Sequence, residues 1–377
     1  RVPDTRLALG DLARFWRGQF SIPFIGVTGS NGKTTVKEMI GSIMSEIGPG
    51  CVTRGNLNND IGMPLTLLRL RANDRYAVIE MGMNHLGEID YLTRITRPTV
   101  ALITNAAEAH LAGVGGLQQV AQAKGEIFSG LTDDGVAIIN VDDRFADYWR
   151  GRARPHRVLT FGLERAADIT CHHVAADNGS DILLMTPTHG EILMRLPLLG
   201  KHNVMNAMAA AAASLSAGAS MPQIKAGLEK LKGISGRLEI KQGVSGARVI
   251  DDTYNANPGS LAAGLQVLRD CTGERVLVLG DMAELGPAAD DIHRRVGELA
   301  KSLGVERLYA LGPMAALAVK SFGQGGRHFQ DAAALIEALI DAMHADMTLL
   351  VKGSRVMQME RVVAGIVRQT PPAGGQR

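Results

Sequence analysis

The chain has 377 residues, 46% of them hydrophobic, which suits a globular protein of roughly two to three domains. Its 40 basic and 38 acidic residues give a formal net charge of +2, which argues against nucleic acid or an anionic membrane surface as a partner. No apolar run reaches the roughly 18 residues of a membrane span. Three widely spaced cysteines read as reduced thiols. We expect a cytoplasmic monomer without membrane insertion.

A short helix is predicted over residues 11–17. An apolar run over residues 22–27 then leads into a glycine-rich turn, and a helical pattern leaves that turn over about residues 34–47. A strand, a turn ending in Gly-Lys-Thr and a helix are typical of a phosphate-binding loop, in which backbone N–H groups and a lysine hold phosphates and a hydroxyl holds Mg²⁺. The loop residues are Gly29, Ser30, Asn31, Gly32, Lys33, Thr34 and Thr35. Val27 stands where the strict motif has glycine, so a turn that binds nothing is the alternative.

Further short apolar runs end in polar residues and are separated by helical patterns. They cover residues 76–79, 100–103 and 136–139. This arrangement predicts βα units of a parallel sheet. Ligands gather at the carboxyl ends of such strands, so Glu80, Asn105 and His110 are predicted on the same edge as Lys33.

Glu80 is the expected Mg²⁺ partner, because a carboxylate after a buried strand beside a phosphate loop commonly holds that metal; a helix cap or a solvated acid is the alternative. Mg²⁺ prefers oxygen, so a structural role for His110 stands beside a ligand role. Chemistry alone does not separate Lys124 from an ordinary surface lysine.

Two polar stretches are candidate binding segments. Asn59 lies in a loop over residues 55–64 that is rich in asparagine and glycine, where turn formation and substrate binding are both possible. An alanine-rich helix is predicted from about residue 200 to 217, with Asn203 and Asn206 in its first turn. Their amides could cap the helix or contact a purine edge.

Residues 233–236 are the best linker, and a second α/β unit follows them. Its strands are predicted over residues 248–250, 276–279, 308–311 and 349–351. Polar residues again follow these strands, which indicates a second functional edge. No G-x-G-x-x-G fingerprint follows any strand, so a dinucleotide is not implied.

Taken together, these segments resemble the Mur ligases of bacterial cell-wall synthesis. The matching stretches span nearly the whole chain in order: residues 29–37 (GSNGKTTVK), 55–64 (GNLNNDIGMP), 80–84 (EMGMN), 104–110, 123–128 (AKGEIF), 200–206 (GKHNVMN), 236–239 (GRLE), 251–258 (DDTYNANP), 280–286 (GDMAELG) and 352–355 (KGSR). The family's phosphate loop also lacks the first glycine.

The resemblance implies an ATP-dependent ligase that joins D-alanyl-D-alanine to UDP-N-acetylmuramoyl-tripeptide through an acyl phosphate in peptidoglycan precursor synthesis. It implies ATP phosphates at residues 29–35 and Mg²⁺ at Thr34, Glu80, His110 and a carbamylated Lys124. Lys33, Lys124 and His110 are the implied catalytic residues. Asn206, Arg237 and Asp252 are implied nucleotide contacts. Asn255, Asn257, Lys352 and Arg355 are candidates for binding the incoming dipeptide or for closing the domain interface. Asn59 is a further candidate for substrate binding.

The family fold implies a central ATP-binding domain over residues 21–234 and a Rossmann-like C-terminal ligase domain over residues 235–370. The tail, residues 371–377, is expected to be disordered. The family's N-terminal UDP-binding domain has no counterpart, so residues 1–20 read as a linker remnant. A sister ligase adding another amino acid is one alternative, although the Asp-Asn-Pro-Arg motif of the diaminopimelate-adding enzymes is absent. A catalytically impaired nucleotide-binding fragment is the other.

Overall fold

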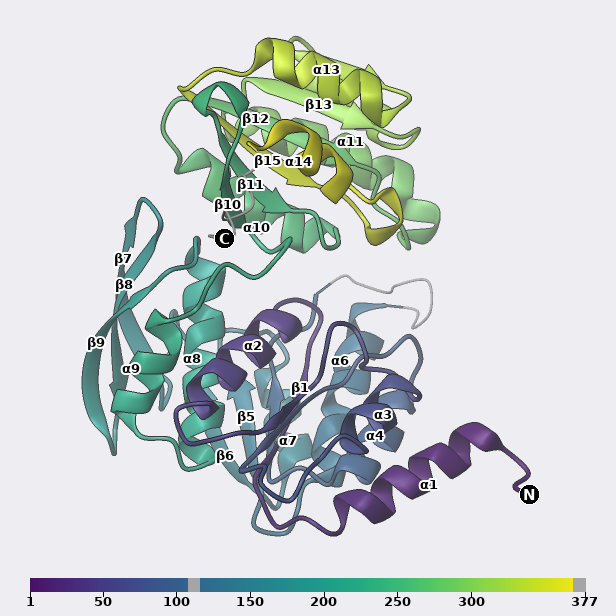
Figure 1. The fold of residues 1–377 in the computed structure, drawn as a ribbon, viewed down its shortest axis with the longest axis vertical. Helices are drawn as coiled ribbons and strands as arrows, with labels where there is room; N and C mark the ends of the chain where they lie inside the picture. The colour runs from purple at the N-terminus through teal and green to yellow at the C-terminus, as the bar shows by residue number, and fades with distance from the viewer. Residues whose placement is uncertain (108–115, 369–377) are drawn as a thin grey trace, which may run out of the picture. The chain divides into compact units, whose positions relative to one another are not determined.

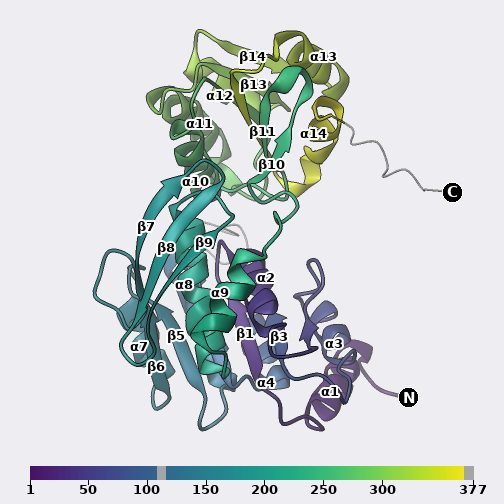
Figure 2. The same cartoon turned by 60° about the vertical axis from the view of Figure 1, so that its left-hand side comes forward.

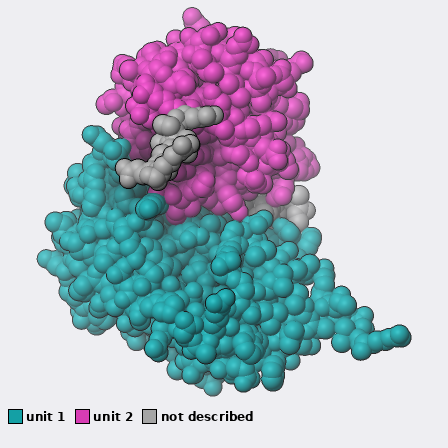
Figure 3. Space-filling view, viewed as in Figure 1, with its two compact units in different colours: residues 1–232 teal, residues 233–377 magenta. Residues whose placement is uncertain are grey.

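The computed structural model describes residues 1–107 and 116–368 and divides the chain into two compact units (Figures 1 and 3). Unit 1 is Arg1–Lys232 and unit 2 is Gly233–Arg377. His110 and the tail predicted to be disordered lie outside the described residues. No helix in the described ranges is long and apolar enough to cross a membrane.

Unit 1 is built on a six-stranded parallel sheet whose strand order is β2-β3-β1-β4-β5-β6. The strands are β1 (Phe24–Thr28), β2 (Cys51–Val52), β3 (Ala77–Glu80), β4 (Val100–Ile103), β5 (Val136–Asn140) and β6 (Arg157–Phe161). Every residue of β1, β3 and β4 is buried, as expected for parallel strands covered on both faces. This confirms the predicted α/β class.

Helices cover both faces of this sheet. In chain order they are α1 (Thr5–Arg17), α2 (Lys33–Met44), α3 (Gly62–Leu67), α4 (Glu88–Thr96), α6 (Leu117–Gly125), α7 (Ala146–Ala153), α8 (Lys201–Ser216) and α9 (Met221–Glu229). Helices α2 and α8 pack together on one face, and α3, α4, α6 and α7 pack along the other (Figure 1). The predicted helix at residues 11–17 was too short, because Asp4 caps α1 by accepting from the N–H groups of Arg6 and Leu7.

Helix α8 is buried on almost every side. Its central turns are a run of alanines, residues 209–213, each no more than 1% exposed. Such a helix packs closely against its neighbours because alanine adds a single carbon to the backbone.

A separate antiparallel sheet precedes α8. Its strands, in the order β7-β8-β9, are β7 (Thr170–Ala176), β8 (Gly179–Thr186) and β9 (Gly190–Leu196). Figure 2 shows this sheet beside α8 and α9, and its strands contact both helices.

Unit 2 holds a second six-stranded sheet, with the order β10-β11-β15-β12-β13-β14. The strands are β10 (Glu239–Gln242), β11 (Arg248–Asp252), β12 (Glu274–Gly280), β13 (Arg307–Leu311), β14 (Gly326–Phe329) and β15 (Met347–Lys352). Only the β10–β11 pair is antiparallel. The helices are α10 (Pro258–Arg269), α11 (Ala289–Ser302), α12 (Ala315–Phe322), α13 (Ala332–Ala342) and α14 (Glu360–Ile366).

Candidate nucleotide and metal site

The predicted phosphate loop connects β1 to α2, and its two glycines hold backbone conformations that other residues rarely adopt. Gly29 has φ +149°, and a Cβ there would lie 1.9 Å from Thr104 Oγ1. Gly32 has φ +81°, and its Cβ would lie 2.5 Å from Asn206 Oδ1. The loop therefore depends on glycine at both positions.

The segment after β4 braces the loop from the side. Asn105 accepts from the Asn31 N–H through Oδ1 at 3.0 Å and donates to the Asn31 carbonyl at 3.1 Å. Thr104 donates to the same carbonyl at 2.6 Å. Ser30 Oγ exchanges hydrogen bonds with the backbone of Ala107 at 2.9 and 3.0 Å. The backbone of residues 30–31 is thus set before any ligand arrives.

Helix α2 begins at Lys33 with Gly32 as its N-cap residue, so no capping side chain occupies the N-terminal end. Backbone N–H groups and the helix dipole favour an anion at such an end. Lys33 Nζ donates to the carbonyls of Gly29 and Ser30 at 2.7 and 3.2 Å, which keeps its positive charge over the loop.

Glu80 ends β3 at the level of Val27, directly before the phosphate loop. Its side chain is only 2% exposed. Oε1 accepts from Asn58 Nδ2 at 2.8 Å, while Oε2 is buried without a hydrogen-bond partner among the described residues. An unpartnered buried carboxylate oxygen is costly unless it binds a ligand, so this group fits a hard cation.

No group of three or more His, Cys, Asp or Glu side chains gathers as a metal site in the described parts of the chain. Mg²⁺ commonly takes only one or two carboxylates and completes its shell with phosphates and water. Glu80 beside a phosphate loop is consistent with that arrangement.

Lys124 lies on α6 and is 1% exposed, so it is not the surface lysine that chemistry alone suggested. Burial lowers the pKa of its ammonium well below the usual range, and the positive charge of Lys33 lowers it further. The carboxylates of Glu126, Glu80 and Glu88 oppose this shift. Lys33, Glu80 and Lys124 thus share one electrostatic neighbourhood.

The two predicted asparagines of unit 1 have different surroundings. Asn206 is buried, donates to Asn203 Oδ1 at 3.0 Å and lies against Gly32, which brings it to the phosphate loop. Asn59 Oδ1 accepts from the N–H groups of Ile61 and Gly62 at 3.3 and 2.8 Å. Turn formation at the start of α3 therefore accounts for the known contacts of Asn59.

In unit 2, Asp252 and Lys352 end the neighbouring strands β11 and β15 and pair in register. Lys352 Nζ donates to Asp252 Oδ2 at 2.5 Å and to the Asn255 carbonyl at 2.9 Å. Burial lowers the pKa of Lys352, although Asp252 opposes the shift. The side chain of Lys352 is 2% exposed, so it orders the loop after β11.

Two other candidates of unit 2 also make local contacts. Asn257 caps α10, because its Oδ1 accepts from the Ser260 N–H at 2.8 Å. Asn255 Oδ1 accepts from the backbone of Ala256 at 2.9 Å and of Arg355 at 3.3 Å. Arg237 stacks its guanidinium over the Tyr254 ring, with 4.1 Å from Cζ to the ring centroid.

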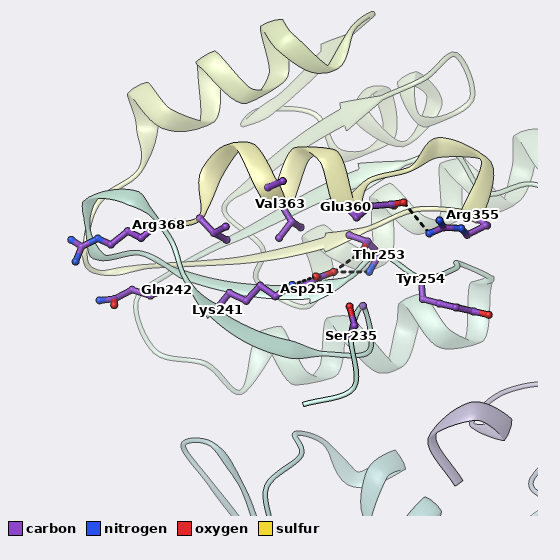
Figure 4. A pocket seen from close by; sticks show the side chains of 13 residues that line it. Ser235, Lys241, Gln242, Asp251, Thr253, Tyr254, Arg355, Glu360, Val363 and Arg368 are labelled. Carbon is purple, nitrogen blue, oxygen red and sulfur yellow. Dashed lines mark hydrogen bonds and ion pairs between the residues drawn. The ribbon is translucent and has the colours of Figure 1, made fainter. Parts of the chain in front are cut away.

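A pocket of about 900 Å³ lies in unit 2 between β10, β11 and α14 (Figure 4). Its lining includes Arg355, which bonds Glu360 Oε1 at 3.0 Å across exposed surface. On the opposite wall Lys241 donates to Asp251 Oδ2 at 2.5 Å.

Two residues that hold the site were missed from the sequence. Asn58 supports the Glu80 carboxylate, and Asp143 accepts from the backbone of Ala106 and Phe145 at 2.7 and 2.9 Å, which fixes the segment beside the phosphate loop. Burial raises the pKa of Asp143. The only sequence signal for Asp143 is its position shortly after the predicted strand at residues 136–139.

Two family models match the chain. The Mur ligase middle domain matches residues 27–214, and the Mur ligase, glutamate ligase domain, matches residues 236–355. The UDP-N-acetylmuramoyl-tripeptide–D-alanyl-D-alanine ligase of Escherichia coli (strain K12) is 47% identical over 369 residues, covering 97% of this chain and 81% of that enzyme. The enzyme of the same name from Haemophilus influenzae is 42% identical over 372 residues, covering 96% of this chain and 80% of the relative.

Solved structures agree. MurF from Acinetobacter baumannii has a TM-score of 0.91 and 41% identity, covering 96% of this chain and 80% of that chain. MurF ligase from Thermotoga maritima in complex with ADP has a TM-score of 0.85 and 25% identity, covering 97% of this chain and 84% of that chain. The fold and the sequence relatives are those of an ATP-dependent ligase. The chain belongs to the Mur ligase family, which confirms the resemblance.

Proposed function

We propose that this chain is an ATP-dependent ligase that forms the amide bond between UDP-N-acetylmuramoyl-tripeptide and D-alanyl-D-alanine, acting as a cytoplasmic monomer in peptidoglycan precursor synthesis. The observation that carries the proposal is a phosphate loop, an unpartnered buried carboxylate and a buried lysine in one neighbourhood. They occur in a chain that is 47% identical over 97% of its length to the ligase of that name.

Residues 29–35 would hold the ATP phosphates. The loop carries N–H groups at the start of α2 and the ammonium of Lys33 at its rim, which suits a polyanion. Asn206 would contact the nucleotide from unit 1, and Arg237 and Asp252 from unit 2, as the family resemblance implies.

Thr34, Glu80 and His110 would hold Mg²⁺, with Glu80 Oε2 as the carboxylate oxygen. When bound, the metal neutralises charge on the phosphates. The hydrogen bond from Asn58 holds the Glu80 carboxylate in place, so that Oε2 would be available to the metal. Lys33 would add a positive charge beside the phosphates.

Lys124 would carry a carbamate. Its neutral nitrogen attacks the carbon of CO₂, an N–C bond forms, one C–O π bond breaks and the nitrogen loses a proton to solvent. Burial favours the neutral amine that this addition needs. The product is an anion, which replaces a buried amine by a group able to hold a second Mg²⁺.

Arg355 is the candidate for the carboxylate of the dipeptide. Its pair with Glu360 lies at the surface, with side chains 60% and 43% exposed, and such pairs contribute little free energy. Exchanging Glu360 for a substrate carboxylate would therefore be inexpensive. Asn255, Asn257 and Lys352 would act by ordering the loop after β11, because their known contacts are with the protein itself.

The family resemblance implies the chemistry of the reaction. A carboxylate oxygen of the tripeptide attacks the γ-phosphorus of ATP, the P–O bond to ADP breaks, and an acyl phosphate results. The neutral dipeptide amine then attacks the acyl carbon and an N–C bond forms. The C–O bond to phosphate breaks, inorganic phosphate leaves and the nitrogen loses a proton to solvent. Lys33 offsets the charge of the transferred group, and positioning supplies most of the rate gain.

The test is phosphate release by this chain with ATP, Mg²⁺, UDP-N-acetylmuramoyl-tripeptide and a panel of amino acids and dipeptides. Release that depends on the tripeptide and is selective for D-alanyl-D-alanine supports the proposal. Selectivity for a single amino acid would assign a sister ligase. Nucleotide binding without release in any combination would indicate an impaired nucleotide-binding protein.

A further inference from the structure

Lys37 is a fully buried lysine that the proposed reaction does not use. It lies on α2, one turn after Lys33 and Thr34, and its side chain is 0% exposed. Its Nζ donates to the Thr53 carbonyl at 2.9 Å and lies 2.7 Å from Glu38 Oε1. Removing an ammonium from water costs several kcal/mol, and an apolar side chain of similar volume would fill the space without that cost. The Lys37 ammonium holds Thr53 in position through the hydrogen bond to its carbonyl.

Thr53 in turn holds the strand that carries Glu80. It follows β2 at the edge of the sheet, and its N–H donates to the Val78 carbonyl at 3.0 Å. Its hydroxyl oxygen accepts from the Glu80 N–H at 3.0 Å and also lies 3.3 Å from the Val78 carbonyl, to which it donates. The backbone of Glu80 is therefore fixed by Thr53.

The chain leaving Thr53 then returns to Glu80. Five residues later, Asn58 donates from Nδ2 to Glu80 Oε1 at 2.8 Å, and its carbonyl accepts from the Gly82 N–H at 2.9 Å. One segment, residues 53–58, thus holds the backbone of Glu80 at its start and the carboxylate at its end. Lys37 anchors the start of that segment to α2.

We infer that Lys37 is a positioning residue that acts through Thr53 to set the separation between α2 and the Glu80 carboxylate. The inference rests on the proposed function, in which Thr34 on α2 and Glu80 on β3 share one Mg²⁺. Two ligands on different elements bind one small ion well only if their separation is fixed, because Mg²⁺ demands near-octahedral geometry at short distances. Lys37 touches neither nucleotide nor metal in this account.

Three variants test it. Lys37→Met removes the donor and keeps the bulk, and Thr53→Val removes the hydroxyl that accepts from Glu80. Glu38→Gln is the matched control, because it removes the ion pair of Lys37 but leaves the bond to Thr53. Binding of Mn²⁺ in the presence of ADP, followed by electron paramagnetic resonance, reports the metal site without turnover. The Mg²⁺ concentration for half-maximal phosphate release and the thermal unfolding midpoint complete the set.

Lys37→Met and Thr53→Val should each weaken Mn²⁺ binding by about tenfold or more, the usual effect of losing an outer partner of a metal ligand. Their effects should not add in the double variant, because both act on one path. Glu38→Gln should bind like the wild type. Wild-type Mn²⁺ binding in either variant, whatever its unfolding midpoint, would overturn the inference.

Glu80→Ala separates this inference from the proposed function. If Glu80→Ala binds Mn²⁺ like the wild type, the proposed metal site is wrong. If Glu80→Ala loses binding while Thr53→Val retains it, only the positioning role fails. Should Lys37→Met not fold, Thr53→Val alone decides, since every path from Lys37 to Glu80 described here passes through Thr53.

Discussion

Lys33 is the lysine of the phosphate loop, and its ammonium lies against the loop backbone. We expect Lys33→Ala to lower the rate of phosphate release by about 10³-fold or more, by analogy with other contacts that stabilise a charged transition state. The fold should survive, because the described hydrogen bonds of Lys33 go to two carbonyls of its own loop, outside the hydrophobic core. Steady-state assays with an unfolding curve decide the matter. Near-normal turnover in a folded variant would remove the catalytic role of this loop.

Lys124 permits a chemical test of the carbamate. Lys124→Ala should be inactive at the limit of the assay, and millimolar formate or acetate should restore part of the activity by filling the vacated anionic site. Lys225 is a matched control, a half-exposed helical lysine of the same unit, and Lys225→Ala should behave like the wild type. An active Lys124→Ala without added carboxylate would reduce Lys124 to a structural residue.

At the scale of elements, the phosphate loop demands glycine where the backbone leaves the usual region. Gly29→Ala should weaken ADP binding at least tenfold, because the new Cβ meets Thr104 Oγ1 at 1.9 Å and φ is +149°. Calorimetric titration measures this. Gly151→Ala, in the last turn of α7 with nothing within 4 Å of its Cβ, should bind ADP normally and gain stability by about 0.5–1 kcal/mol. Equal ADP affinity in both variants would contradict the steric argument.

Asn257 at the start of α10 has two candidate roles, as the N-cap of the helix and as a substrate contact, and stability measurements distinguish them. As an N-cap, Asn257→Ala should lower the free energy of unfolding by about 1 kcal/mol, while Asn257→Asp, which also caps, should retain stability. Denaturant unfolding gives both values. If both variants instead raise the KM for D-alanyl-D-alanine equally at unchanged stability, Asn257 contacts the substrate rather than the helix.

Several elements were predictable because their signals are local. The buried strands β1, β4, β12 and β15 appear in the sequence as apolar runs that end in polar residues, and the structure has strands there. The phosphate loop is recognised by its glycines and its Gly-Lys-Thr sequence between β1 and α2. The strands β7 and β9 have a weaker sequence signal, because most of their residues are exposed or half-buried and form no long apolar run. The antiparallel β10 was missed because its residues are exposed or half-buried and form no apolar run.

Some of the candidate site residues were also predictable from the sequence, and others were not. Lys33, Thr34 and Glu80 follow from motif and strand order. Lys124 was recognised only through family resemblance, because nothing in a helix sequence says which lysine is buried. Asn58 and Asp143 act through bonds across 22 and 37 residues, which depend on register and loop path. For Asn59 and Asn257 the sequence does not distinguish two roles, because an asparagine that caps a helix or forms a turn looks the same as one that binds a substrate.

At the scale of the molecule, the proposal requires one nucleotide to engage both units. Hydrogen exchange with and without ADP and Mg²⁺ tests this. Protection should rise at the start of α2 in unit 1 and also around Arg237 and Asp252 in unit 2, because a ligand that binds only the native state suppresses opening where it makes contacts. Added protection confined to unit 1 would contradict the assigned roles of Arg237 and Asp252.

The alanine run of α8 has a consequence for how this sequence can change over time. The run packs beside α2, and the same helix carries Asn206 against Gly32. A larger side chain at residues 209–213 would push α8 outward and draw Asn206 away from the loop. These alanines touch no proposed substrate, yet they have as little freedom to drift as the residues that do. In a map of tolerated substitutions these alanines would be as intolerant to change as the phosphate loop. Their intolerance would reflect packing and not ligand binding.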